Sequence, residues 1–408
     1  MGLATSLVPT KESMLPSIRI AKSEYEARAR ALAGHLSQQG LSGCVLFDGF
    51  HVTYYTDFAF IPTERPVVLS VNAQGERTLL VPRLELEHAQ AEAVVDSVET
   101  YVEYPDNPHP MARLRDILRI LGFGQRIGAD SDGYPWILGY QGPSLSEITG
   151  TQVVPISAFI EAQMAIKSAG ELALIRESAK WSHLAHRLLQ RYTRVGATET
   201  EVSLRASQES TLALVDTLGP LYKARSMCSE GAQAGYRGQI GRHAAIPHAL
   251  AMNAVFRAGD LLVTGATAAM WGYQAELERT MVVGTPSEEQ KRFFEHMKTV
   301  QEVAFGALRP GVRCCNVDRA VRAYYEEHDL MPFWKHHTGH SIGLRYHEGP
   351  FLDSGDDTVL LPGMVLTVEP GLYVEGLGGF RHSDTVVITD AGMELITYYP
   401  RDLESLTI

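Results

Sequence analysis

The stretch HHTGHSIGLRYHEGP, residues 336–350, is the most informative part of this sequence for both fold and function. It places His340 and His347 among glycines and follows them with Glu348 and a proline. A segment rich in histidine and glutamate is a candidate acid–base or metal site. A single histidine beside glycine is more often a structural hydrogen-bonding group, so the neighbouring segments must decide.

Four other segments of the same half of the chain supply polar groups of the same kind. They are IPHALAMNAVFRAGDLL (246–262) with His248, GYQAELERT (272–280) with Glu276 and Glu278, TVEPGLY (367–373) with Glu369, and GFRHSDTVV (379–387) with Arg381. Side chains alternate along a strand, so Glu276 and Glu278 are expected on one face. Taken alone, each segment could be only a turn or a surface ion pair. The occurrence of all these segments in this order favours a functional site.

The bulk composition excludes several classes of function. The 408 residues carry a formal net charge of −12, which argues against non-specific nucleic-acid binding. Apolar runs are strand-sized, so no membrane span is predicted, and the N-terminus lacks a secretory pattern. Four cysteines without CxxC spacing favour a reduced, cytoplasmic compartment.

Alternating strand and helix patterns up to about residue 155 predict an α/β (α+β) architecture. A helix is expected at 23–39, and strands at 43–49, 52–60, 65–71 and 77–82. A break at 168–170 marks the expected domain boundary. Thr285, Pro286 and Glu288 resemble a helix start with a capping box.

The motifs in their order resemble the pita-bread superfamily, which includes prolidase, aminopeptidase P, methionine aminopeptidase and creatinase. HHTGHSIG, HEGP, TVEPGLYV and GFRHSDTVV are similar to prolidase, whereas YYTDF, TERP, IKSAGELALIR and LERT are similar to creatinase. The resemblance implies two domains: a creatinase/prolidase-like N-terminal domain over 1–165 and a pita-bread catalytic domain over 166–408.

The resemblance also implies where metal ligands would lie. The metallopeptidases of this family use Asp, Asp, His, Glu and Glu, and these positions fall on Gly265, Glu276, His340, Glu369 and Ser383. Because the positions of the first and last ligands carry no carboxylate, we expect no dinuclear metal site and no cofactor. A single metal ion on Glu276, His340 and Glu369 stays open. His382 is next to the last position but should point to the opposite face of its strand.

Creatinase differs from the peptidases at the positions of Gly265, Glu276 and Ser383, and it works without metal. Carried over from it, His248 is the catalytic acid–base, Glu278 and Glu369 hold the substrate, and Arg65 reaches the partner subunit's site in a homodimer. The prolidase-like RYHEGP segment and Glu276 depart from creatinase, so the resemblance does not give the substrate.

Elementary electrostatics leads to a similar expectation. Three inward carboxylates, those of Glu276, Glu278 and Glu369, would repel each other unless a proton, an arginine or a cationic substrate neutralised them. Arg279 and Arg381 are the internal candidates. Near neutral pH, His248 could transfer a proton to and from the reacting groups.

The leading hypothesis is therefore a metal-independent hydrolase that cleaves a C–N bond of a small cationic or zwitterionic molecule. His248, His340 and His347 are the predicted catalytic residues, and Arg65, Glu276, Glu278, Glu369 and Arg381 the predicted substrate-binding residues. Two alternatives stay open: a metal-dependent Xaa-Pro dipeptidase or lyase on the same fold, and a catalytically inactive binding module.

Overall fold

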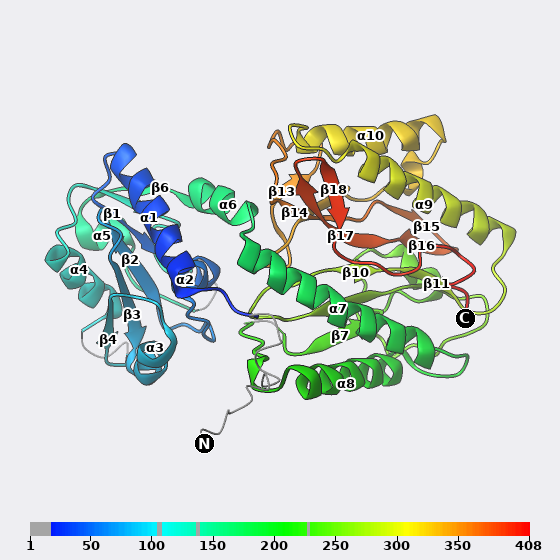
Figure 1. Cartoon of the computed structure of the whole chain (residues 1–408), viewed down its shortest axis with the longest axis horizontal. Helices are drawn as coiled ribbons and strands as arrows, with labels where there is room; N and C mark the ends of the chain where they lie inside the picture. The colour runs from blue at the N-terminus through cyan, green and yellow to red at the C-terminus, as the bar shows by residue number, and fades with distance from the viewer. Residues whose placement is uncertain (1–17, 104–107, 136–138, 227–228) are drawn as a thin grey trace, which may run out of the picture.

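A computed structural model describes residues 18–103, 108–135, 139–226 and 229–408. The expected lead-in over residues 1–17, with the N-terminal pattern, and Cys228 lie outside the described residues. The chain forms two α/β domains, which are separated along the long axis in Figure 1. The predicted fold class is confirmed.

The N-terminal domain is built on a mixed six-stranded sheet in the order β4-β3-β2-β1-β5-β6. Its strands are β1 (Gly43–Leu46), β2 (Val68–Asn72), β3 (Arg77–Pro82), β4 (Ser97–Tyr101), β5 (Arg126–Ala129) and β6 (Gln152–Pro155). Its helices are α1 (Lys22–Gln38), α2 (Gly49–Thr56), α3 (Leu86–Glu92), α4 (Pro110–Ile120), α5 (Leu145–Thr149) and α6 (Ser157–Ala165). Every residue of β1 is buried, because Cys44 and Leu46 face one hydrophobic cluster and Val45 faces another.

The prediction of a strand over residues 52–60 is wrong. Most of this segment belongs to α2, although its β-branched and aromatic residues favour strands. Asp48 caps the helix by accepting hydrogen bonds from the backbone N–H groups of Phe50 and His51. The cap and the burial of Val52 and Tyr55 override the local preference.

The C-terminal domain contains an eight-stranded sheet in the order β13-β12-β14-β17-β10-β9-β7, with β18 paired to β17. Its strands are β7 (Ala232–Gly235), β9 (Gly265–Ala268), β10 (Leu277–Glu278), β12 (Gly339–Ser341), β13 (Glu348–Leu352), β14 (Val365–Val368), β17 (Ser383–Thr389) and β18 (Gly392–Leu395). Two short pairs accompany it, β8 (Leu261–Val263) with β11 (Thr280–Val282) and β15 (Gly371–Val374) with β16 (Gly378–Arg381).

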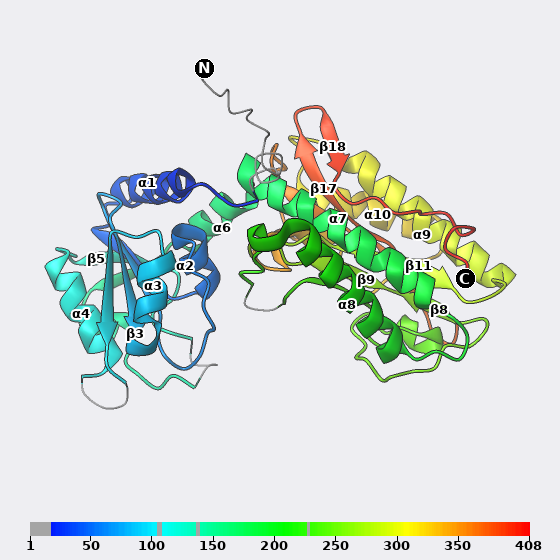
Figure 2. The same cartoon turned by 60° about the horizontal axis from the view of Figure 1, so that its bottom comes forward.

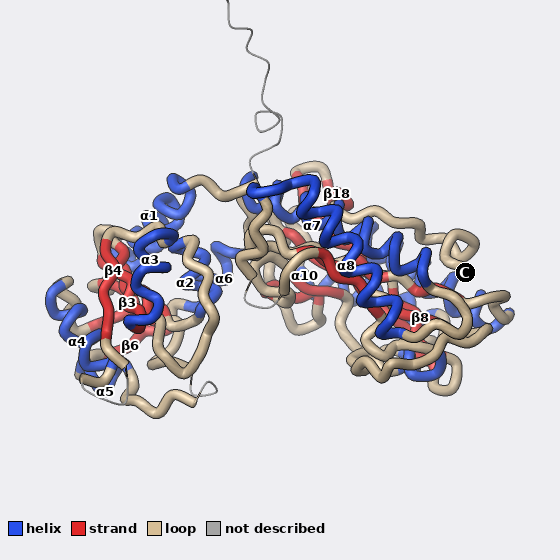
Figure 3. Tube along the Cα trace, turned by 90° about the horizontal axis from the view of Figure 1, so that it is seen from below, coloured by secondary structure: helices blue, strands red, loops and turns tan. Residues whose placement is uncertain are grey.

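Four helices flank this curved sheet. They are α7 (Ala169–Tyr192), α8 (Glu199–Leu218), α9 (Glu288–Ala307) and α10 (Cys314–Glu327). The pairs α7–α8 and α9–α10 lie on either side of the strands in Figure 1, and α7 and α8 run side by side in Figures 2 and 3. Strands β10, β12 and β14 of the eight-stranded sheet carry Glu276, His340 and Glu369 to one place.

Helices α7 and α9 both begin with a capping box. Helix α7 begins directly after Ser168, whose side chain forms a capping box with Glu171, within the predicted break at 168–170. Helix α9 begins later than predicted, because Ser287 is the cap and Gln290 completes the box, in place of Thr285 and Glu288. Across the described residues, no helix is long and apolar enough to cross a membrane.

Candidate functional site

The polar motifs converge because neighbouring strands carry them. Glu276 immediately precedes β10, His340 lies in the middle of β12, and Glu369 immediately follows β14. Gly339 permits this arrangement, since a Cβ there would lie 2.1 Å from the Thr367 carbonyl oxygen on β14. The close approach of β12 to β14 thus brings His340 to the end of the strand that delivers Glu369.

Three of these side chains form a compact cluster. One possible ligand atom from each of Glu276, His340 and Glu369 lies within 4.8 Å of the other two, and all three residues are buried. His340 Nε2 lies 3.2 Å from Glu369 Oε1, although the geometry is not that of a hydrogen bond. Its Nδ1 donates a hydrogen bond of 2.9 Å to the Ser341 carbonyl oxygen, which orients the ring and leaves Nε2 facing Glu369.

The three groups perturb one another's protonation. Burial raises the pKa of Glu276 to about 7, and the charges of Glu369 and Glu278 act in the same direction. Burial alone would lower the pKa of His340, but Glu369 and Glu276 outweigh it and raise that pKa to about 9. Although burial opposes the shift, His340 and Arg381 hold the pKa of Glu369 well below its usual range.

Glu278 is held by two arginines. Arg381 donates to both carboxylate oxygens through Nε and, at 2.9 Å, through one terminal nitrogen. Arg237 donates to Oε1 at 2.7 Å. This differs from the expectation that Glu278 is free to hold a cationic substrate group. Of the two internal arginines considered, Arg381 neutralises the site, whereas Arg279 pairs with Asp384 at 2.8 Å.

His347 and His248 lie toward solvent. The exposed His347 ring stacks on that of His340, with centroids 3.8 Å apart. Burial and then the charge of His340 lower the pKa of His347 to about 4, so its ring is neutral at pH 7. The exposed His248 is near enough to contribute to that shift. Its acid–base role stays a prediction.

The two positions without carboxylates have acquired other contacts. Ser383 donates a hydrogen bond of 2.6 Å to Glu276 Oε1. A Cβ at Gly265 would meet Glu278 Oε1 at 3.5 Å, an ordinary contact distance, so a side chain could begin there without a clash, and the glycine lines a pocket. His382 is fully buried and packs edge-on against Phe294, on the opposite face of its strand from Ser383.

Arg65 lies elsewhere in this chain. Its guanidinium contacts Glu103 and Glu64 in the N-terminal domain, each at 2.5 Å. In the described part of one subunit, no hydrogen bond or ion pair joins Arg65 to Glu276, His340 or Glu369. A role for Arg65 in the partner's site stays a prediction.

Two site residues were missed by the sequence analysis. Arg237 follows β7 in a segment without a recognisable motif. Tyr346 lies directly before His347, and its hydroxyl is close enough to Glu276 for that carboxylate to raise the tyrosine's pKa beyond the effect of burial. Its position beside His347 in the quoted stretch was the available signal. No sequence signal pointed to Arg237, because residue spacing does not predict its left-handed backbone conformation, with a φ of 51°.

The donor set fits one metal ion and does not fit two. The family implies a metal at this place, and His340 Nε2 is a buried nitrogen without a hydrogen-bond partner, aimed at two carboxylates. A histidine with its other nitrogen bonded to a carbonyl is the usual arrangement of a metal ligand. At Gly265 and Ser383 there is no anionic oxygen, and Arg237 and Arg381 lie beside Glu278.

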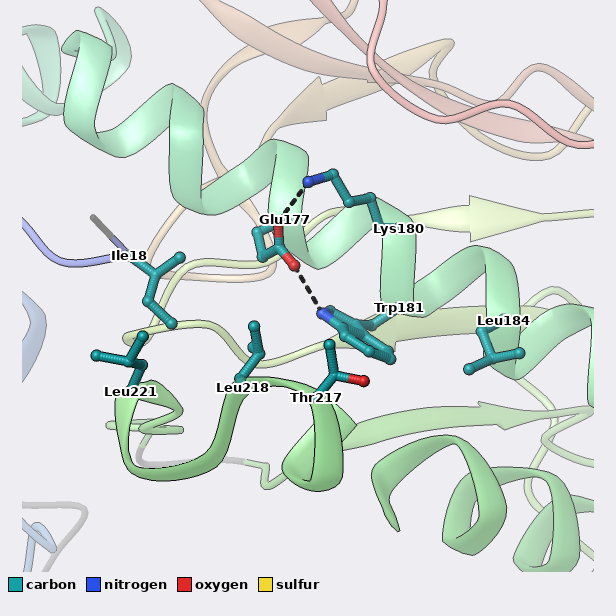
Figure 4. Close-up of a pocket in the computed structure, with 8 residues that line it drawn as sticks. All are labelled: Ile18, Glu177, Lys180, Trp181, Leu184, Thr217, Leu218 and Leu221. Carbon is teal, nitrogen blue, oxygen red and sulfur yellow. Dashed lines mark hydrogen bonds and ion pairs between the residues drawn. The ribbon is translucent and has the colours of Figure 1, made fainter. Parts of the chain in front are cut away.

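A separate pocket lies between α7, α8 and the start of the described chain, shown in Figure 4. It is largely apolar, with Trp181 and Leu218 in its lining. Glu177 is already bonded to Lys180 at 2.6 Å and to the Trp181 indole at 2.9 Å. This pocket therefore offers no free acid–base group for catalysis among the residues drawn.

Known proteins resemble the chain over nearly its whole length. The probable dipeptidase PepE of Mycobacterium tuberculosis is 27% identical over 391 residues, covering 95% of this chain and 98% of that protein. The Xaa-Pro dipeptidase of Pyrococcus furiosus is 37% identical over 163 residues, covering 40% of this chain and 47% of that protein. The crystal structure of dipeptidase PepE from Mycobacterium ulcerans superposes with a TM-score of 0.80 at 25% identity, covering 96% of this chain and 100% of that one.

Family profiles account for both domains. The Creatinase/Prolidase N-terminal domain matches residues 28–166, and metallopeptidase family M24 matches residues 173–390. The second match includes every residue of the cluster and both arginines at Glu278. It agrees with the pita-bread resemblance and with a hydrolase, while the predicted metal-free branch is not established by it. The chain belongs to metallopeptidase family M24.

Proposed function

We propose that this protein is a hydrolase of a C–N bond in a small peptide-like substrate, acting with a single divalent metal ion held by Glu276, His340 and Glu369. The observation that carries the proposal is the buried cluster itself: His340 Nε2 lies 3.2 Å from Glu369 Oε1, and one possible ligand atom from each of Glu276, His340 and Glu369 lies within 4.8 Å of the other two. The relatives named as dipeptidases support the substrate class. This departs from the metal-independent mechanism favoured by the sequence, and adopts its alternative.

A bound ion would supply Lewis-acid activation of the scissile carbonyl and of water. The chain's own groups have separate tasks. Glu276 and Glu369 provide negative charge, and the carbonyl of Ser341 orients the His340 ring. With a pKa of about 4, His347 is neutral at pH 7 and can donate a hydrogen bond to the substrate at the cleft. His248 is the proposed proton carrier at the mouth.

The metal-free hydrolase remains the second candidate, because one observation favours it. Ser383 already donates a hydrogen bond to Glu276, and a Glu276 carboxyl with a pKa near 7 can hold a proton in place of a metal. Under this candidate, His248 alone activates water.

One experiment separates the two candidates. Purified protein is titrated with Mn²⁺ and Zn²⁺ by calorimetry, and hydrolysis of a panel of Xaa-Pro and other dipeptides is followed with and without EDTA. We expect one ion per chain and activity that EDTA removes. His340→Ala should lose the ion and lower kcat/KM by more than about 100-fold. Mutation of residues that merely hydrogen-bond to metal ligands already lowers metal affinity or activity by about 10–100-fold. The matched control His336→Ala leaves all three ligands in place and should keep the stoichiometry.

Activity that persists in EDTA, with no bound ion, would transfer the proposal to the metal-free hydrolase. Absence of hydrolysis of every dipeptide, with one ion bound, would refute the substrate class and leave the metal site standing.

A further inference from the structure

A pocket of about 560 Å³ opens on the side of the site where the family's first aspartate is missing. Gly265, Arg237 and Tyr346 all line it, and Phe50 of the N-terminal domain contributes to its wall. Tyr346 connects this pocket to the cluster, because its hydroxyl is close enough to Glu276 for that carboxylate to raise the tyrosine's pKa beyond the effect of burial. The pocket is therefore contiguous with the proposed reaction centre and is not part of the metal-ligand set.

Arg237 gives this pocket a positive character. About half of its side chain is exposed, while the Glu278 carboxylate that it contacts is buried. Glu278 also accepts two hydrogen bonds from the fully charged Arg381, so two guanidinium groups share one carboxylate. Arg381 is shared with Glu369, which lies 3.8 Å away, so Arg237 is the exposed partner of Glu278. It is the only charged residue among those that line the pocket in the described chain.

Neutral polar groups line other parts of this pocket. Ser203, Thr267 and Gln274 line the same pocket and offer hydroxyl and amide groups without adding charge. A planar guanidinium with neutral donors around it matches a carboxylate, which accepts charge-assisted hydrogen bonds. A cationic group would be repelled by the same arrangement.

The backbone supports a dedicated role for Arg237. Its φ of 51° lies in the left-handed region, where residues other than glycine are uncommon. Such conformations persist mainly where surrounding structure enforces them, often at functional sites. Here Tyr236 on one side is buried, and Gly238 on the other approaches the Leu250 carbonyl so closely that a Cβ would lie 2.0 Å from it.

We propose that this pocket is an anion subsite, in which Arg237 binds a carboxylate of the substrate at the place left open by Gly265. The identification of the anion as part of a substrate rests on the proposed function. The existence of the subsite does not, because it depends only on the pocket and its charge. An aspartate at 265 would introduce a carboxylate next to Glu278 and would compete for Arg237.

The test compares a carboxylate with its neutral counterpart. N-acetylglycine and N-acetylglycinamide are titrated into the purified full-length protein, and binding is followed by ligand-observed NMR. We expect the carboxylate to bind about 10-fold more tightly than the amide, as hydrogen bonds to charged groups imply. Arg237→Gln should abolish the difference, whereas Arg257→Gln, the same change at an exposed arginine outside the pocket, should preserve it.

Gly265→Asp provides a second variant in case Arg237→Gln does not fold. It should weaken binding of N-acetylglycine by about 10-fold and leave N-acetylglycinamide unaffected, because the new carboxylate occupies Arg237. Equal binding of both probes by the wild-type protein would overturn the proposal, and so would a preference for the carboxylate that survives Arg237→Gln or Gly265→Asp. Because no turnover is measured, a protein that hydrolyses no peptide could still pass this test.

Discussion

The two sides of the site handle negative charge in opposite ways. On one side, Glu276, His340 and Glu369 face one another, and protons move onto Glu276 and His340. Among the described residues no arginine is hydrogen-bonded to Glu276, and Arg381 approaches Glu369 only to 3.8 Å. On the other side, Glu278 lies between Arg237 and Arg381. Carboxylates that only protons neutralise can exchange those protons for a metal ion. A carboxylate already bonded to two guanidinium groups has no such capacity.

The two sides differ in the carboxylates that they offer a metal ion: Gly265 has no side chain to offer, whereas Glu276 and Glu369 lie beside His340. Removing a ligand carboxylate at 265 leaves space and one negative charge fewer, and Arg237 occupies the surroundings of that space. Ser383, in place of the last ligand, bonds to Glu276 and keeps it oriented. Under the proposed function, catalysis takes place at Glu276, His340 and Glu369. The four predictions below test the contrast between this cluster and the arginine-paired Glu278, in order of decreasing effect.

The largest effect is expected from His248, which is exposed and close enough to His347 to influence its pKa. His248→Ala should lower kcat by about 10²–10⁴-fold with little change in KM, because positioned acid–base groups contribute that much. Steady-state kinetics on the dipeptide that the panel identifies would measure it, with His243→Ala from the same segment as control. A rise in KM with kcat preserved would make His248 a binding residue.

The second prediction contrasts the two sides directly by the same substitution two residues apart. Glu278→Gln should destabilise the fold by about 3–5 kcal/mol, because it leaves the buried guanidinium of Arg381 without its counter-ion. Glu276→Gln should change stability by less than about 1 kcal/mol, since glutamine replaces a carboxyl group that is protonated about half of the time near pH 7.

Urea unfolding followed by fluorescence in EDTA would measure both free energies without a contribution from bound metal. Equal losses of stability in the two variants would contradict the division of the site into a guanidinium-neutralised side and a proton-neutralised side.

Much of this division could be read from the sequence. The order of the motifs identified the fold, the family and the positions of Glu276, His340 and Glu369, because strand neighbours in this fold bring those motifs together. Arg381 was recognised as a possible internal counter-ion. Arg237 was not, because its contact with Glu278 depends on how β7 packs beside β9, which the spacing of residues does not encode.

The errors have the same physical origin. The segment containing Tyr54 and Tyr55 favours a strand by composition, but the cap at Asp48 and burial in the domain core make it a helix. At α9, Thr285 and Ser287 are both good caps, and the choice between them is made by the contact of Gln290 with the Gly259 carbonyl. Local sequence offered two solutions, and tertiary contacts selected one.

The third prediction concerns the support of the catalytic side. Arg345, two residues before His347, contacts Glu161 at 2.6 Å and Asp48 at 3.0 Å in the N-terminal half of the chain. The buried His51 joins the same network through Asp130 and Glu161, each at 2.9 Å. Burial alone would lower the pKa of His51, but these two carboxylates outweigh it and raise that pKa to about 9.

Because the pKa of His51 is higher in the folded than in the unfolded chain, protonated His51 stabilises the fold. This stabilisation is complete below about pH 6.5 and is lost as the pH rises through about 9. The loss is at most about 3 kcal/mol, at 1.36 kcal/mol per unit. Urea unfolding at pH 6.5 and pH 9.5 should show this decrease in the wild-type protein and a smaller one in His51→Gln. The same decrease in both proteins would assign the pH dependence to other groups.

The smallest effect is expected from Arg65, which tests whether the site of one subunit is complete. We propose a homodimer in which Arg65 reaches the partner's site, as the creatinase resemblance implies. In one chain its guanidinium is partly exposed and contacts Glu64 and Glu103, so it is paired at the surface and is not committed to a buried partner.

Arg65→Ala should raise KM for a carboxylate-bearing dipeptide by roughly 10-fold and leave kcat and the dimer unchanged, because a charge-assisted hydrogen bond at the rim contributes to binding alone. Arg113→Ala, which removes a comparable surface pair with Glu99 on the same domain, is the matched control and should leave KM unchanged. Kinetics combined with light scattering measures both properties. A fully active monomer, or an unchanged KM in Arg65→Ala, would show that Arg237 and the cluster of Glu276, His340 and Glu369 suffice without the partner subunit.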